Sequence, residues 1–302
     1  MSDAAPPVPR NLLRVSDLEP GSLAALLDLA AVMKARPHGF VEALRGDTVV
    51  CFFEKPSTRT RVSFAAAADR LGMMPLLLGP DELQLGRGET LEDTARTLSG
   101  YAAAIVLRTF AQGTVDRMAA VATAPVINAL TDEHHPCQAL ADLLTLRERF
   151  GQLEGLRVAY VGDGNNVAAS LLEASALAGI DAIAACPPGY EPNVPGAHVT
   201  HDPLEAVTGA AAVYTDVWVS MGDEATSEEH RSALEPYRVD ARLLSAAGPD
   251  AVFMHCLPAH RGEEVTAEVI DGPQSVVWQQ AENRLPTEEA LLFALVLRRW
   301  EP

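Results

Sequence analysis

The sequence has no apolar run long enough to cross a membrane, and its N-terminus lacks the positive-then-apolar layout of a secretory signal peptide. Cysteine is scarce as well. Cys51, Cys137, Cys186 and Cys256 have neither the spacing of a disulfide framework nor that of a zinc ribbon. These absences predict a protein of the reducing cytoplasm that does not bind membranes.

Positive charge is also in short supply. The chain has 23 lysine and arginine residues against 41 aspartate and glutamate residues, a formal net charge of −18. This argues against nucleic acid and anionic membrane as partners. Apolar residues, in contrast, make up 48% of the chain, which indicates a globular protein, and a length of 302 residues favours two domains.

Apolar runs alternate with helical stretches, an order that predicts βαβ units. The expected strands are Thr48–Phe53, Pro75–Leu78, Ala103–Leu107, Pro125–Asn128, Arg157–Val161, Asp181–Ala185, Ala211–Asp216, Ala251–His255 and Ser275–Trp278. The expected helices are Leu23–Met33, Thr58–Leu71, Thr90–Ser99, Val115–Ala122, Cys137–Phe150 and Pro286–Trp300. Five prolines make a full crossover helix improbable within Cys186–Leu204. The pattern predicts an α/β fold of two doubly wound parallel-sheet domains, with a hinge near Cys137.

The junction after the first strand is the most informative segment. The buried run Thr48–Phe53 leads into an Ala-rich helix, and Ser57 or Thr58 can cap the N–H groups with which that helix begins. A helix N-terminus flanked by hydroxyls and by the guanidinium groups of Arg59 and Arg61 suits a phosphate. The simpler alternative is an ordinary capped helix with surface arginines.

Other polar residues follow predicted strands in the same way. Arg108, His135 with Gln138, Asp216, and His255 with Cys256 all occupy such positions, where open α/β sheets bind ligands. Each also has an ordinary structural explanation: a surface arginine, a structural histidine, a helix cap or an inert buried thiol. We regard the neighbouring His134 as structural.

Four segments together resemble the aspartate and ornithine carbamoyltransferases, in that family's order and over most of the chain. They are Ser57-Thr58-Arg59-Thr60, His135-Pro136-Cys137-Gln138, Asp216-Val217-Trp218-Val219-Ser220-Met221-Gly222 and His255-Cys256-Leu257-Pro258. The Ser-Met-Gly triplet is the family's mark of ornithine as acceptor. The resemblance implies the transfer of a carbamoyl group from carbamoyl phosphate to the δ-amine of L-ornithine, giving L-citrulline and phosphate in arginine metabolism.

The resemblance also implies site residues. Those expected to bind carbamoyl phosphate are Ser57, Thr58, Arg59, Thr60, Gln84, Arg108, His135, Gln138, Cys256, Leu257 and Arg284. Those expected to act in catalysis are Arg59, Thr60, Arg108, His135, Gln138 and Cys256, and those expected to bind ornithine are Asn166, Asp216, Ser220 and Met221.

The same resemblance implies how the chain is organised. It implies a carbamoyl-phosphate domain over residues 1–136 and an ornithine domain over 137–285, with a cleft between them. A C-terminal helix over 286–302 is expected to pack back on the first domain. Gln84 is expected to reach a neighbouring subunit's site, which implies a homotrimer. The resemblance implies no cofactor, and the histidines and cysteines lack the spacing of a metal site.

The chain departs from the family at several positions and leaves alternatives open. Ala65 stands where a glutamate is usual, Ala169 where histidine or asparagine is common, and Pro286 where a histidine is usual. These changes make a different amine or amino-acid acceptor more plausible. Gly162-Asp163-Gly164-Asn165-Asn166 is a weak dinucleotide motif that would fit an oxidoreductase, since its third glycine is missing. A non-catalytic ligand-binding relative is the third alternative.

Overall fold

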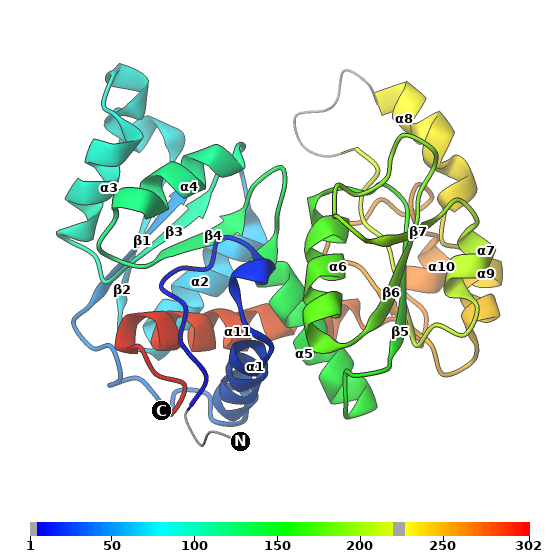
Figure 1. The fold of residues 1–302 in the computed structure, drawn as a ribbon, viewed down its shortest axis with the longest axis horizontal. Helices are drawn as coiled ribbons and strands as arrows, with labels where there is room; N and C mark the ends of the chain where they lie inside the picture. The colour runs from blue at the N-terminus through cyan, green and yellow to red at the C-terminus, as the bar shows by residue number, and fades with distance from the viewer. Residues whose placement is uncertain (1–4, 220–226) are drawn as a thin grey trace. The chain divides into compact units, whose positions relative to one another are not determined.

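A computed structural model describes residues 5–219 and 227–302. The chain forms two compact units, Met1–Leu140 together with Asn283–Pro302, and Ala141–Glu282. Each unit is built on a single all-parallel sheet with helices on both faces, which confirms the predicted fold class (Figure 1). No described helix is long and apolar enough to cross a membrane.

The first unit has a four-stranded sheet in the order β2-β1-β3-β4. Its strands are β1 (Thr48–Phe53), β2 (Met74–Leu78), β3 (Ala104–Arg108) and β4 (Val126–Leu130). Its helical segments are η1 (Val15–Asp17), α1 (Pro20–Ala35), α2 (Thr58–Arg70), η2 (Pro80–Glu82), η3 (Gln84–Arg87), α3 (Leu91–Ser99) and α4 (Gln112–Val121). Helices α3 and α4 share an apolar cluster with one face of the sheet, and α1 and α2 lie on the other side (Figure 1).

The second unit has a five-stranded sheet in the order β7-β6-β5-β8-β9. Its strands are β5 (Arg157–Val161), β6 (Asp181–Ala185), β7 (His198–Thr200), β8 (Ala212–Tyr214) and β9 (Val252–Met254). Its helical segments are α6 (Asn166–Ala178), α7 (Pro203–Val207), α8 (Ser227–Leu234), η5 (Glu235–Tyr237), α9 (Ala241–Ala247) and α10 (Ala267–Ile270). Helices α7, α9 and α10 share an apolar cluster with the sheet, and α6 covers the opposite face (Figure 1).

Two helices connect the units along the chain. Helix α5 (Pro136–Phe150) follows β4, and α11 (Val277–Leu297) follows α10. The last residues of the chain bond to its beginning within the first unit, because the indole N–H of Trp300 donates to the carbonyl of Pro6 at 2.8 Å. The finer domain limits expected from the sequence remain a prediction.

Most predicted elements are confirmed to within a few residues, but the region before the last helix was predicted wrongly. Ser275–Trp278 is no strand: Ser275 makes only an isolated bridge to Phe253, and α11 already begins at Val277. Pro286, expected to open the terminal helix, lies inside α11. Proline removes one helical hydrogen bond, and the hydroxyl of Thr287 supports this turn by donating to the carbonyls of Asn283 and Arg284 at 2.8 and 3.0 Å.

The proline-rich segment contains no long helix, as predicted, but it holds a short strand, β7, that was not predicted. Three residues of β7 pair with β6, from Ile183↔His198 to Ala185↔Thr200. So short an edge strand gives little alternation to detect in the sequence.

Candidate active site

In the first unit, three neighbouring strands end beside one another and carry most of the predicted phosphate ligands. β1 pairs with β3 in a register that sets Phe53 opposite Arg108, and β3 pairs with β4. The chain moves to one side of β1 for β2 and to the other side for β3, so the strand order reverses between β1 and β3. Ligands of open α/β sheets bind at such reversals.

Helix α2 begins at this point with a capped and accessible N-terminus. The N–H of Thr60 donates to Oγ of Ser57 at 3.2 Å, so Ser57, and not Thr58, is the N-cap. Thr58 and Arg59 are exposed, whereas Thr60 is buried. The remaining N–H groups of the first turn and the helix dipole favour an anion.

The loop after β4 holds His135 in place through buried hydrogen bonds. Oε1 of Gln112 accepts from Nδ2 of Asn128 at 3.1 Å and from the hydroxyl of Thr131 at 2.7 Å. The backbone of Thr131 then closes a turn by donating to the carbonyl of His134 at 2.8 Å. The next residue, His135, precedes α5 and accepts the N–H of Gln138 at 3.1 Å with its own carbonyl.

His135 is buried and lies in a positive field. Burial lowers its pKa well below the usual range, and Arg284, Arg108 and Arg59 lower it further. The imidazole is therefore neutral at physiological pH and can donate one hydrogen bond to a carbonyl oxygen. These arginines make the local charge positive despite the acidic composition.

Lys55, a basic residue that follows β1, is paired with other groups. Its ammonium pairs with the carboxylate of Asp132 and lies 4.4 Å from the centre of the Phe110 ring. The carboxylate offsets its charge.

Arg284 projects from α11 and joins two other predicted ligands. It is only 4% exposed; its Nη1 donates to Oε1 of Gln138 at 2.9 Å, and its Nη2 lies 3.4 Å from the hydroxyl of Thr60. It also forms a buried ion pair with Glu288 at 2.6 Å. Glu288 was not predicted as part of the site, because a glutamate within a helical run carries no signal of its own.

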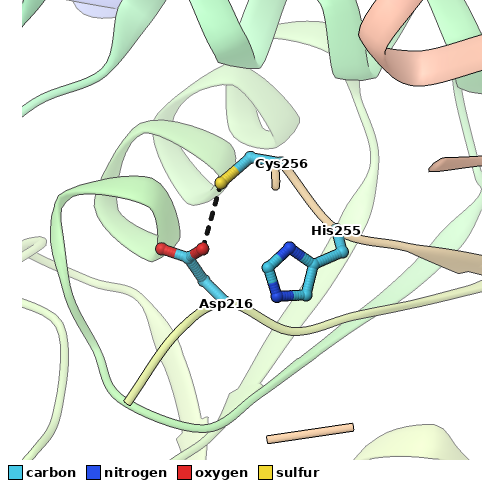
Figure 2. A group of neighbouring side chains, drawn as sticks. All are labelled: Asp216, His255 and Cys256. Atoms are coloured by element: carbon cyan, nitrogen blue, oxygen red, sulfur yellow. Dashed lines mark hydrogen bonds between the residues drawn. The ribbon is translucent and has the colours of Figure 1, made fainter. Parts of the chain in front are cut away.

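In the second unit, the ends of β5, β8 and β9 bring a further group together (Figure 2). The thiol of Cys256 lies 3.0 Å from Oδ1 of Asp216, and Nδ2 of Asn165 donates to Oδ2 of the same carboxylate at 2.9 Å. Asn165 also caps α6, with its Oδ1 accepting from Val167 N at 2.9 Å. The predicted ligand Asn166 is the first residue of that helix. The preference of asparagine for N-caps could have identified Asn165.

His255 fixes the backbone of the segment that follows β9. The N–H of Leu257 donates to Nδ1 of His255 at 2.9 Å, so Nε2 carries the proton of the neutral ring and donates to Oε1 of Glu264 at 3.2 Å. Leu257 has a positive φ of 59°. A non-glycine residue rarely adopts this conformation, and local hydrogen bonds of this kind stabilise it.

Two groups of side chains in the described part of the chain have the composition of a metal site. Asp216, His255 and Cys256 each offer a ligand atom within 4.8 Å of the others, as do His260, Glu263 and Glu264. In the first group the thiol and the carboxylate already bond to each other, and both ring nitrogens of His255 have partners. A metal ion would have to displace these bonds, and the absence of a metal stays a prediction.

The remaining predicted ligands lie away from these groups or outside the described residues. Gln84 is exposed on η3, which follows the edge strand β2. Ser220 and Met221 lie outside the described residues.

Comparisons with known proteins match most of the chain. Residues 10–148 match the carbamoyl-phosphate-binding domain of the aspartate/ornithine carbamoyltransferases, and residues 154–295 match their aspartate/ornithine-binding domain. An ornithine carbamoyltransferase of Parafrankia sp. is 54% identical over 95% of this chain and 96% of its own length.

Solved structures agree. The ornithine carbamoyltransferase of Thermus thermophilus has a TM-score of 0.89 and 46% identity, and that of Pyrococcus furiosus has 0.89 and 48%. Both comparisons cover 95% of this chain, together with 99% and 97% of the respective structures.

Proposed function

The chain belongs to the aspartate/ornithine carbamoyltransferase family and has the function of an ornithine carbamoyltransferase, and we propose how its residues share the reaction. Carbamoyl phosphate and L-ornithine give L-citrulline and phosphate. The first unit binds carbamoyl phosphate and the second binds the amino acid. The assignment of roles depends on one observation: α2, Arg108 and His135 follow the carboxyl ends of neighbouring strands in the first sheet.

The phosphate group is held at the N-terminus of α2. The hydroxyls of Ser57 and Thr58 donate to it together with the N–H groups of the first turn. Arg59 and Arg108 add positive charge, and a guanidinium can bind two phosphate oxygens at once. As the bond to the carbamoyl carbon breaks, the same groups stabilise the charge of the leaving phosphate.

The carbonyl oxygen is held by a second set of donors. The δ-amine of ornithine attacks the carbonyl carbon, and negative charge develops on this oxygen in the tetrahedral transition state. Arg59, Thr60, neutral His135 and the amide of Gln138 donate to it. Because these donors are already in place, they need little reorganisation during the reaction.

The second unit orients the amino acid. Asp216 pairs with an ammonium group of ornithine, and Asn166, Ser220 and Met221 contribute to the same site. Cys256 acts beside the reacting amine, and the backbone of Leu257 meets the carbamoyl group. The bonds of Asp216 to Asn165 and Cys256 support this assignment, because they fix the carboxylate before the substrate arrives.

A trimer completes the site with Gln84 from a neighbouring subunit. A groove beside the N-terminus of α2 is lined by Pro56, Ser57, Thr58, Arg61, Val62, Ala65, Ala66 and Leu77. Val62, which lines the groove, is 62% exposed and offers an apolar side chain to a partner. We assign this groove to a second copy of the chain, whose Gln84 then reaches the proposed phosphate ligands.

Two alternatives receive less support. The first is a different amine acceptor, which would use the same chemistry. A dinucleotide would need space at the turn before α6, but Gly164 there packs against the chain itself: its N–H donates to the carbonyl of Tyr190 at 2.9 Å, and a Cβ at Gly164 would lie 2.3 Å from Pro192 N.

Calorimetry with carbamoyl phosphate tests the phosphate site, with Arg59→Ala as the variant and Arg45→Ala, an exposed arginine of the same unit, as its control. We expect saturable binding that only Arg59→Ala abolishes. Incubation with a panel of amines, followed by an assay for ureido products, tests the acceptor. No binding of carbamoyl phosphate, or a product from an amine other than ornithine, would contradict the proposal.

A further inference from the structure

The bond between Arg284 and Gln138 determines which way the Gln138 amide points. A guanidinium can only donate hydrogen bonds, so the atom that Arg284 Nη1 meets at 2.9 Å must be the amide oxygen. The NH2 group of Gln138 is then turned away from Arg284. In the proposed mechanism this NH2 group donates to the carbonyl oxygen of carbamoyl phosphate, so Arg284 selects the productive orientation of the amide.

Arg284 is itself fixed by a carboxylate one helical turn further along α11. A single oxygen of Glu288, Oε1, accepts both from Nε of Arg284 at 3.0 Å and from its Nη2 at 2.6 Å. Glu288 and Arg284 are 1% and 4% exposed, so water screens the pair little. With two of its donors fixed by Glu288, the guanidinium presents Nη1 to Gln138.

We propose that Glu288 is a positioning residue for the transfer reaction: it holds Arg284 so that Gln138 and Thr60 face the carbonyl oxygen of carbamoyl phosphate. This inference rests on the proposed function. Glu288 touches neither substrate in this arrangement and acts through Arg284. Its influence falls on the donors that stabilise developing charge, not on those that hold the phosphate group.

A positioning role explains this geometry better than a purely structural ion pair does. Replacing a buried ion pair by other groups is often neutral for stability, so such a pair is weak evidence of a stabilising role. The adjacent residue provides the comparison, because Glu289 is also fully buried but lies 3.7 Å from Arg70, which is not a predicted ligand. One glutamate thus faces the site residues, and its neighbour faces an arginine outside the site.

If Glu288 positions Arg284, replacing it should lower kcat without weakening the binding of phosphate. Glu288→Gln keeps the size of the side chain but removes the charge that fixes Arg284. Removing an oxyanion donor costs about 100- to 1,000-fold in kcat, and misorienting one should cost less, roughly 10- to 100-fold. Affinity for inorganic phosphate should stay within about 3-fold, because Ser57, Thr58, Arg59 and Arg108 are unaltered.

Kinetics and calorimetry on the purified, full-length protein test this, with Glu289→Gln as the matched control. We expect Glu288→Gln to lower kcat and to reduce the preference for carbamoyl phosphate over inorganic phosphate, while Glu289→Gln changes neither. In a Gln138→Ala background, Glu288→Gln should lower kcat less than it does in the unaltered protein, because the part of its action that passes through the amide is already missing.

Other outcomes overturn the inference. It fails if the two glutamine variants lower kcat equally, or if Glu288→Gln weakens both ligands to the same extent. Should Glu288→Gln not fold, Glu288→Asp keeps the charge but retracts it by one methylene; unchanged kcat in that variant would also refute the inference. If the unaltered protein makes no citrulline, the proposed function fails instead, and the two failures remain distinguishable.

Discussion

The thiol of Cys256 meets Oδ1 of Asp216 at 3.0 Å (Figure 2), while Asn165 donates to the other oxygen of that carboxylate at 2.9 Å. Cys256 and Asp216 are 40 residues apart in the sequence and come from the ends of different strands. Both oxygens of the carboxylate therefore have a partner from the protein, and Asp216 is oriented before ornithine binds. This preorganisation lowers the entropic cost of recognising an ammonium group.

Asp216→Asn should weaken ornithine recognition specifically. A hydrogen bond to a charged group contributes about 1.5–3 kcal/mol, so KM for ornithine should rise roughly 10- to 100-fold. Affinity for carbamoyl phosphate, measured without ornithine, should not change. Asp181→Asn is the control, because that aspartate is exposed on β6 and lies 3.7 Å from Arg157. Equal effects of the two substitutions would argue against a role for Asp216 in the site.

The rate should depend on pH through the attacking amine. A free alkyl amine has a pKa near 10. Below that pH, the neutral form that attacks becomes about tenfold more abundant for each unit by which the pH rises. Burial and nearby arginines hold the pKa of His135 well below its usual range, so we assign the rise in rate to the amine and not to this histidine. We expect kcat/KM for ornithine to rise over this interval, and a flat profile where chemistry limits the rate would contradict the step.

Mixing two inactive variants tests whether neighbouring subunits share a site. Arg59→Ala and Gln84→Ala should each abolish or strongly reduce activity alone. If Gln84 completes the site of a neighbour, random trimers refolded from equal amounts should contain intact sites in about a quarter of positions. Recovered citrulline formation is the expected result. Mixtures that stay as inactive as their components would show that each subunit works with its own residues.

Glu289 predicts a pH-dependent stability. Burial raises its pKa from 4.5 to about 7, against the opposing influence of Arg70. The native protein thus retains a proton that the unfolded chain releases, so this contribution to stability is complete below about pH 4.5 and is lost as the pH rises through about 7.

Glu289→Gln removes this titration. The variant should match the unaltered protein near pH 4.5 and become more stable with rising pH, by up to roughly 3 kcal/mol above pH 7. Urea unfolding midpoints between pH 5 and pH 8 measure the difference. A variant less stable at pH 8 would mean that the ion pair with Arg70 outweighs the cost of burying the carboxylate.

Local chemistry explains which parts of the molecule could be predicted from the sequence. Uninterrupted apolar runs identified β1, β5 and β6 with their observed limits, and the position before an Ala-rich helix narrowed the cap to Ser57 or Thr58, of which Ser57 is the one observed. Both features depend on neighbours in the chain. The limits of α11 were not predictable in this way, because Pro286 is tolerated inside the helix where Thr287 supports the turn.

The supporting residues of the site were harder to find. Glu264 and Glu288 are buried carboxylates whose partners, His255 and Arg284, lie nine and four residues away. No periodic pattern tells which buried carboxylate will face a site residue, since this depends on how a loop closes or on which side of a helix faces the core. Asn165 could have been predicted in part. The sequence indicates its position before α6, but it does not indicate the hydrogen bond to Asp216.

The three arginines around His135 have a consequence for how the substrate arrives. At long range an anion meets a molecule with a formal net charge of −18, and only at close approach does the attraction of these guanidinium groups dominate. Dissolved salt screens the distant repulsion more strongly than the enclosed attraction, since the Debye length falls to about 8 Å at physiological ionic strength. Moderate salt should therefore speed the capture of carbamoyl phosphate, the reverse of its usual effect on an enzyme that attracts its anionic substrate through a positive surface.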